Sequence, residues 1–244
     1  WRPPSPRRSR DTEMRKTPFV INEYYHIYNR GVDKRIIFLD EDDVLRFYNS
    51  IKEFNVLEPI GSIYENSFAK KLGRKLGSPT SKSKLDALVS LIAHCINPNH
   101  FHLLLRQETE KGIEKFMHRV GTGYTKYFNN KYKRNGALFQ GRFKSVHIDS
   151  NEYLLHASVY VNLNDRVHQL GSQLGSPTSK LMQSVSSWRE YAEEDENAQG
   201  ICAKDIILGQ FRNRREYKEF ATSTLKDIIE RRTDLKDLEK IFLE

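Results

Sequence analysis

The chain has 244 residues, of which 38% are hydrophobic and 30% are charged. This length is enough for one domain with extensions around a single core. No window approaches the ~18 uninterrupted apolar residues of a membrane span, so no membrane association is expected. The chain has 40 Lys and Arg against 32 Asp and Glu, which gives a formal net charge of +8. This positive charge favours a polyanionic partner.

The N-terminus is basic and lacks an apolar stretch, so a signal peptide is not expected. The two cysteines give neither a disulfide framework nor a zinc pattern, which favours a reducing cytoplasm. We expect residues 1–15 to form a flexible basic arm. The chain begins with Trp1, and we expect Met14 to be its natural start.

The first predicted strand is Glu23–Asn29, which is rich in β-forming residues and ends at Arg30-Gly31. Acidic residues from Asp40 to Asp43 then open a helix, because acidic side chains favour the positive N-terminal end of a helix. Apolar residues follow at helical spacing as far as Phe54.

Two buried strands are predicted next, Leu85–Ile96 and His100–Arg106, joined by the turn Asn97-Pro98-Asn99. Ile113–Tyr132 reads as a second helix, broken or bent near Gly121 and Gly123.

Gly136–Ile148 is predicted to be a fourth strand, and Asn151–Asn164 a third helix capped by Ser150 or Asn151. The order β-α-β-β-α-β-α predicts an α+β, ferredoxin-like split βαββαβ core, with an antiparallel central sheet and helices on one face. We expect this domain to span residues 16–168. A helical extension should occupy residues 188–244, with its tail from Arg214 to Phe242.

The segment Leu76–Lys82 (LGSPTSK) recurs word for word at Leu174–Lys180. Its Gly, Ser, Pro and Thr content predicts disordered surface loops, one inserted at about 66–84 and one in a linker at 169–187. We interpret both as translated copies of one DNA repeat; a flexible linker duplicated without meaning is the alternative.

Basic and aromatic residues are interspersed between Lys111 and Asp149. This segment contains nine Lys and Arg and seven aromatic residues, but only two acidic residues. Such a mixture suits a groove that follows phosphates and stacks unpaired bases. A solvated helix face whose aromatics fill the core would give the same composition.

His100-Phe101-His102 lies on a predicted strand, where period-two alternation puts both imidazoles on one side. Two such histidines can chelate one divalent ion, although the pattern alone is often incidental. His26 and His94 lie on neighbouring strands, and each could support a ligand or be a satisfied core histidine.

Tyr160 and Asn164 are four residues apart on the third predicted helix and therefore share a face. A tyrosine can attack a phosphodiester to give a phosphotyrosine, which stores the bond energy for rejoining. Both could equally be ordinary helix residues. The other tyrosines weighed as nucleophiles, Tyr153, Tyr124, Tyr127 and Tyr132, have no amide at this spacing.

Four collinear motifs over about residues 20–168 resemble the single-tyrosine HUH transposases, especially the REP-associated tyrosine transposases. They are Tyr25–Gly31, Asn97–Leu105, Arg134–Ser145 and Tyr160–Asn164. Asp165 stands where the family commonly has Pro, which should alter the helix end. Asn164 stands where some relatives have Gln, which makes the third metal ligand less secure.

The resemblance implies a metal-dependent single-stranded DNA endonuclease and strand transferase, associated with the nucleoid, that forms a 5′-phosphotyrosine on Tyr160. It implies that His100, His102 and Asn164 bind Mg²⁺ or Mn²⁺, and that the substrate is single-stranded or hairpin DNA. It leaves a homodimer open. We expect DNA contacts from Arg30, Lys126, Arg134, Gln140, Arg142 and Lys144.

Two alternatives remain. One is a non-catalytic, domesticated hairpin-DNA-binding protein of the same fold. The other is a phosphohydrolase that uses His100 and His102 without a nucleophile, for which no DxD or HD pair supplies the further carboxylate ligands.

Overall fold

The computed structural model describes residues 18–61, 63, 87–169, 184–193 and 200–241. The predicted arm at 1–15, the insertion at about 66–84 and both LGSPTSK copies lie outside the described residues. None of the described helices is long and apolar enough to cross a membrane.

A five-stranded antiparallel sheet lies at the centre of the fold, in the order β4-β1-β3-β2-β5. Its strands are β1 (Tyr24–Arg30), β2 (Val89–Asn97), β3 (His100–Gln107), β4 (Lys144–Ile148) and β5 (Val185–Ser186). Helix α1 (Glu41–Glu53) connects β1 to β2, and α3 (Gly112–Lys131) connects β3 to β4. This order is that of a split βαββαβ core, so the predicted ferredoxin-like α+β class is confirmed.

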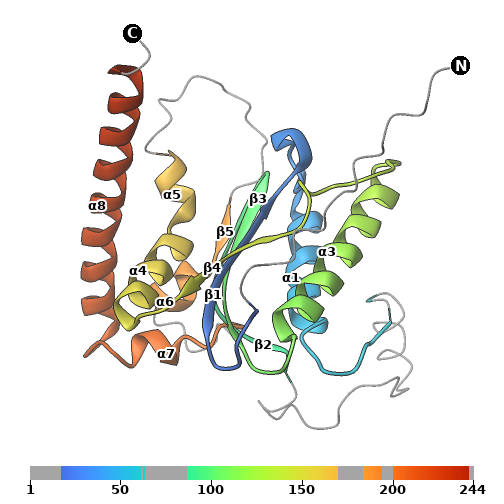
Figure 1. The fold of residues 1–244 in the computed structure, drawn as a ribbon, viewed down its shortest axis with the longest axis horizontal. Helices are drawn as coiled ribbons and strands as arrows, with labels where there is room; N and C mark the ends of the chain where they lie inside the picture. The colour runs from blue at the N-terminus through green and yellow to red at the C-terminus, as the bar shows by residue number, and fades with distance from the viewer. Residues whose placement is uncertain (1–17, 62, 64–86, 170–183, 194–199, 242–244) are drawn as a thin grey trace, which may run out of the picture.

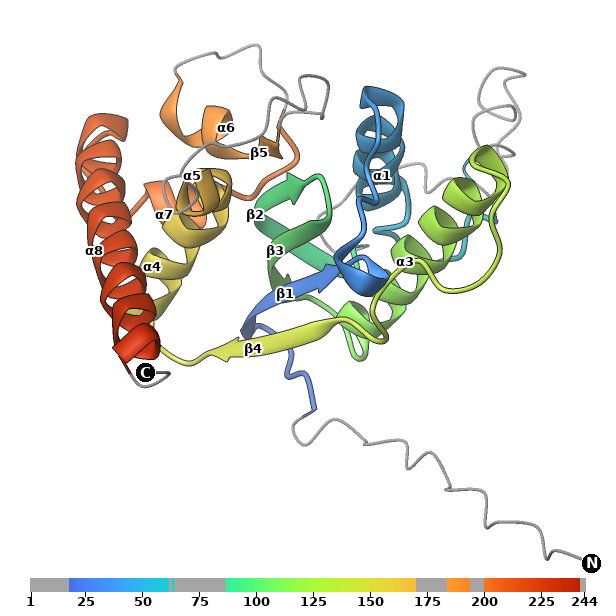
Figure 2. The same cartoon turned by 90° about the horizontal axis from the view of Figure 1, so that it is seen from above.

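Helices cover both faces of the sheet rather than one (Figures 1 and 2). Helices α1 and α3 lie on one face, as the core pattern requires. The other face carries the helices that follow β4, which are α4 (Asn151–Asn162), α5 (Asn164–Gln169), α6 (Trp188–Ala192), α7 (Asp205–Leu208) and α8 (Arg214–Ile241). The predicted helical extension therefore packs onto the domain and completes a second core.

Side chains of strand β3 contribute alternately to the two hydrophobic cores, one on each face of the sheet. Phe101, Leu103 and Leu105 belong to the core beneath α1 and α3, whereas Leu104 belongs to the core beneath α4. Because side chains alternate along a strand, His100 and His102 share the face of Leu104.

The predicted strand Gly136–Ile148 is wrong in its first half. Only Lys144–Ile148 pairs with β1, and the earlier residues make an isolated bridge between Phe139 and Gly31. Gly136 (φ +87°) and Gly141 (φ +72°) adopt left-handed backbone, which interrupts a strand. The predicted strand Leu85–Ile96 likewise begins only at Val89.

The third predicted helix is divided. Ser150 caps α4, since its hydroxyl accepts from the Tyr153 amide at 3.2 Å. The helix ends at Asn162, because Leu163 has φ −113° and ψ 20°, and a second helix, α5, begins at Asn164. Tyr160 and Asn164 therefore stand on successive helices, and Asp165 lies in the first turn of α5 rather than at a helix end.

Helix α3 is continuous, contrary to the predicted break near Gly121 and Gly123. Gly123 instead lets α3 approach the end of α1, since a Cβ there would lie 2.8 Å from Cε2 of Phe54. Gly121 has open space around it. The packing of α3 against α1 therefore requires glycine at position 123 but not at position 121.

We expect Gly121→Ala and Gly123→Ala to change stability in opposite directions. Gly121→Ala should stabilise the protein by roughly 0.5–1 kcal/mol, since alanine is the better helix former and meets no neighbour. Gly123→Ala should destabilise it by about 1 kcal/mol or more, because the methyl overlaps the buried Phe54 ring. Urea unfolding of the two variants would measure this, and equal shifts of the same sign would contradict it.

Candidate active site

The paired histidines of β3 lie at the centre of two rows of side chains that cross the sheet on the α4 face. In the strand registers, His102 lies between Tyr28 and Cys95, and Lys144 lies beyond Tyr28. His100 lies between Arg30 and Asn97. The two imidazole centroids are 5.1 Å apart, with the rings nearly perpendicular. The predicted common face of the pair is therefore present.

His102 is held by His26, whose role the sequence left open. Nε2 of His26 lies 2.8 Å from Nδ1 of His102, and the rings stack at 5.0 Å. Burial lowers the pKa of His26 to about 4, so this imidazole is neutral near pH 7 and its Nε2 can accept. With the proton on Nδ1 of His102, Nε2 of that ring carries the lone pair that a metal ligand needs.

His100 is oriented from both ring nitrogens. Its Nδ1 lies 2.6 Å from Oδ1 of Asn99, which fixes the proton on Nδ1. Its Nε2 lies 3.3 Å from Oδ1 of Asn164. Two atoms that each bind one ion at about 2.1 Å are roughly 3.0–3.4 Å apart, so this pair fits adjacent positions around one cation. Asn164 thus meets His100 although it stands on α5.

Asn97 is a site residue for which the sequence predicted a turn and a place in the second motif but no role in the site. Its Nδ2 donates to Oδ1 of Asn164 at 2.9 Å and lies 3.0 Å from Nε2 of His100. Its Oδ1 accepts from Ser184 Oγ at 2.7 Å. A signal was available, since a two-residue turn places residues 97 and 100 opposite each other. Asn97 holds together the two groups predicted to be metal ligands.

The chemistry of His100, His102 and Asn164, and the burial of Asn164, both suit a divalent cation. Two imidazoles and an amide oxygen can bind such an ion, and Asn164 is fully buried. Nδ2 of Asn164 is buried without a hydrogen-bond partner, so the amide is placed by its oxygen alone. An ion that took the Nε2 lone pair of His100 would replace the hydrogen bond from Asn97.

Tyr160 lies beside this cluster in the same chain. Its ring centroid is 5.7 Å from that of His102 and 5.7 Å from that of His26, edge-on to both. These three side chains line one pocket, together with Tyr28, Tyr153 and His156. The structure therefore places Tyr160 beside His102 and His26, and two further tyrosines, Tyr28 and Tyr153, line the same pocket.

The remaining rival nucleophiles lie elsewhere. Tyr124 is buried beneath α1, and its hydroxyl donates to the Ile37 carbonyl; burial raises its pKa. The hydroxyls of Tyr127 and Tyr132 both donate to the carboxylate of Asp43. Of the four rivals, only Tyr153 shares the pocket of Tyr160, and it is 39% exposed.

The six predicted DNA contacts fall into two groups. Arg30 and Lys144 are exposed and belong to the rows that hold the histidines; Arg30 Nε donates to Gln140. Lys126 lines two pockets beside α3, one with Arg142 and one with Arg134. The guanidinium of Arg134 also lies over the ring of Phe128 at 5.7 Å. The second group therefore lies on the α3 side of the sheet.

Comparison with known proteins supports the resemblance. A family model described as "Transposase IS200 like" matches residues 64–164, a segment that contains both histidines, Tyr160 and Asn164. Among solved structures, the chain is similar to that of a REP-associated tyrosine transposase bound to a REP hairpin, with 14% identity, 80% of this chain and 90% of that chain covered, and a TM-score of 0.46. A search of curated proteins finds no match. The family match spans the second, third and fourth of the sequence motifs, so it agrees with the predicted resemblance over that segment.

We expect the metal-free protein to lose stability as pH falls from about 6.5 towards 4. Burial lowers the pKa of His26 and of His94 to about 4, whereas an unfolded imidazole titrates near 6.5. Between these values the unfolded chain binds more protons, so stability rises with pH. Each histidine can contribute up to about 1.4 kcal/mol per pH unit.

Urea unfolding at about pH 6.5 and about pH 5 would measure this slope. His26→Gln should reduce the slope, and a variant of the exposed His118, His118→Gln, should leave it unchanged. The same slope in wild type and His26→Gln would contradict the assignment.

Proposed function

We propose that this chain is a metal-dependent single-stranded DNA endonuclease and strand transferase with Tyr160 as its nucleophile. The observation that carries the proposal is the position of the Tyr160 ring, 5.7 Å from that of His102 and on the same face of the sheet as His100. Because one chain supplies the phenol and both imidazoles, the proposed reaction does not require a second copy.

In the proposed step, the phenolic oxygen of Tyr160 attacks the phosphorus of a phosphodiester. The bond from phosphorus to the 3′ oxygen breaks, the phenol loses its proton and the departing 3′ oxygen gains one. The 5′ end stays on Tyr160 as a phosphotyrosine, and a second 3′-hydroxyl reverses the step, so no energy source is consumed. A divalent ion bound by His100, His102 and Asn164 would polarise the phosphate and offset its developing charge.

His26 and Asn97 act as positioning residues in this proposal. His26 accepts from Nδ1 of His102 and thereby selects the tautomer whose Nε2 is a ligand. Asn97 holds the oxygen of Asn164 next to His100.

The proposed partner is single-stranded or hairpin DNA. Arg30 and Lys144 stand in the same rows as the two histidines, so their charges would hold phosphates next to the scissile bond. Lys126, Arg134 and Arg142 would hold the flanking DNA beside α3, where Phe139 and Phe143 line the same pocket as Arg142.

Tyr160→Phe should abolish the covalent DNA adduct and leave hairpin binding within about twofold, since only one hydroxyl is removed. Single-stranded DNA from the gene's own flanks, incubated with Mn²⁺ and run on a denaturing gel, would reveal the adduct. Tyr153→Phe, in the same pocket, is the matched control and should keep it. An adduct that survives Tyr160→Phe, or vanishes in Tyr153→Phe alone, would refute the nucleophile. If the wild type binds the hairpin but forms no adduct, the alternative of a non-catalytic hairpin-DNA-binding protein would be favoured.

His100→Ala combined with His102→Ala should remove Mn²⁺-dependent nicking. His26→Gln should lower it by about 10–100-fold, because a residue that orients a ligand tunes metal affinity without supplying a bond. Added Mn²⁺ should partly rescue His26→Gln but not the double variant, as measured by initial rates over a metal titration. Unchanged nicking in the double variant would show that these imidazoles are not ligands.

A further inference from the structure

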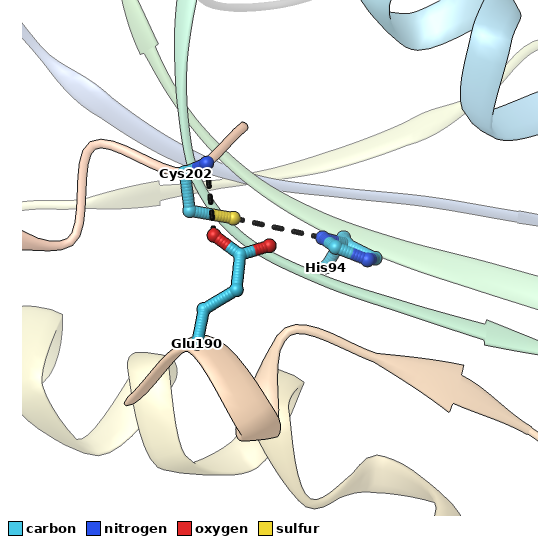
Figure 3. Close-up of side chains that lie close together, drawn as sticks. All are labelled: His94, Glu190 and Cys202. Carbon is cyan, nitrogen blue, oxygen red and sulfur yellow. Dashed lines mark hydrogen bonds between the residues drawn. The ribbon is translucent and has the colours of Figure 1, made fainter. Parts of the chain in front are cut away.

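A second group of metal-binding side chains lies at the outer edge of β2. His94 comes from β2, Glu190 from α6 and Cys202 from the segment before α7, and Figure 3 shows the three side chains turned toward one another. Their ligand atoms all lie within 4.8 Å of one another. We propose that His94, Glu190 and Cys202 supply three of the four ligands of one Zn²⁺, or of a similar borderline-soft divalent ion, with a water molecule as the fourth.

This site is separate from the candidate active site. His94 is paired with Leu103 in the register of β2 and β3, and Leu103 faces α1 and α3. The ring of His94 accordingly lies 5.6 Å from that of Tyr48 on α1. His102 pairs with Cys95, on the α4 face. His94 and His102 therefore point to opposite faces of the sheet.

The distances suit tetrahedral zinc. Zinc binds sulfur at about 2.3 Å and imidazole nitrogen at about 2.0–2.1 Å, so two such ligands at a tetrahedral angle are about 3.6 Å apart. Sγ of Cys202 lies 3.6 Å from Nδ1 of His94. A thiol that donates to a ring nitrogen would have a similar separation, so the third group decides between the two. That group is a carboxylate, Glu190.

The charge balance favours a cation. Across the described ranges, no Lys, Arg or His forms an ion pair with the Glu190 carboxylate. Its Oε2 instead accepts from the Cys202 amide at 3.2 Å. His94 is 2% exposed, and burial lowers its pKa to about 4, so it offers a neutral imidazole. Burial, and then the charge of Glu190, raises the pKa of Cys202, so binding of the ion would release the thiol proton.

Gly200 makes room for this arrangement. A Cβ at position 200 would lie 1.8 Å from Oε2 of Glu190, so any side chain there would push the carboxylate away from Cys202. The clashing atoms all belong to the side chain of Glu190, so a side chain at position 200 would move this carboxylate and not the backbone.

A bound ion would link β2, which carries His94, to the C-terminal extension, which carries Glu190 and Cys202. The Ala203 amide donates to the Leu91 carbonyl at 2.7 Å, next to Cys202. Ser187 lies three residues before Glu190. Its amide donates to the His94 carbonyl at 2.9 Å, and its hydroxyl accepts from the His94 amide at 2.8 Å and donates to Oδ1 of Asn162 at 2.6 Å. Asn162 is the last residue of α4, so the site lies close to the end of the helix that carries Tyr160.

The test uses Co²⁺ alone as the probe, added to the full chain after treatment with a chelator. We expect one equivalent to bind tightly and to give the near-ultraviolet charge-transfer band of a cobalt thiolate and the visible bands of tetrahedral cobalt. Cys202→Ser should lose the charge-transfer band, and Glu190→Gln and Gly200→Ala should weaken binding by about tenfold or more. Zn²⁺ should displace the cobalt and raise the Tm of the full chain.

Two controls isolate the site. Cys95→Ser removes the other cysteine, and the double variant His100→Ala with His102→Ala removes the proposed catalytic ligands; both should keep the charge-transfer band. Far-UV circular dichroism of the metal-free variants reports folding, and Glu190→Gln carries the test if Cys202→Ser does not fold. No thiolate band in the full chain, a band that survives Cys202→Ser, or unchanged cobalt affinity in Glu190→Gln would overturn the proposal. None of these outcomes depends on nuclease activity.

Discussion

The alternation of side chains along β3 is the constraint on which the rest of the structure depends. Phe101, Leu103 and Leu105 are almost completely buried beneath α1 and α3, so a slip of one residue would turn them toward the α4 face and put the histidines into the core beneath α1 and α3. The burial of these apolar side chains therefore fixes the direction of His100 and His102. The register of the core thus sets the face of the sheet on which the candidate site lies, and His26, Asn97 and Asn99 then orient the side chains within it.

The second face of the sheet is closed by buried polar groups that are paired with one another. The hydroxyl of Tyr217 on α8 contacts Ser158 and Asn162 on α4, and Asn162 in turn accepts from Ser187. All four residues are almost fully buried, so each contact replaces hydrogen bonds to water that burial removed. The extension is thus joined to α4 by specific geometry in addition to apolar packing, which restricts where Tyr160 can stand.

The sequence was a good guide wherever a periodic pattern decided the structure. The strand that carries His100 and His102, helix α1 with its acidic first turn, and the split βαββαβ order follow from hydrophobic spacing and the preference of acidic residues for helix N-termini. It failed where tertiary contacts decide. Gly123 allows a close approach to Phe54 and does not break α3. Gly136 and Gly141 adopt left-handed backbone, so the strand that apolar content predicted from residue 136 begins only at Lys144. The partnership of Asn97 with Asn164, and of His94 with Cys202, joins residues far apart in the chain that no local pattern connects.

The break at Leu163 changes how the positions of Tyr160 and Asn164 depend on each other. A tyrosine and an amide on one continuous helix must keep a fixed spacing, because one inserted residue rotates everything beyond it by about 100°. Here α4 ends before Asn164, and the amide is anchored to the sheet through Asn97. A residue inserted between Tyr160 and Asn164 therefore need not carry the amide away from His100, because Asn97, opposite His100 in the hairpin, holds it there.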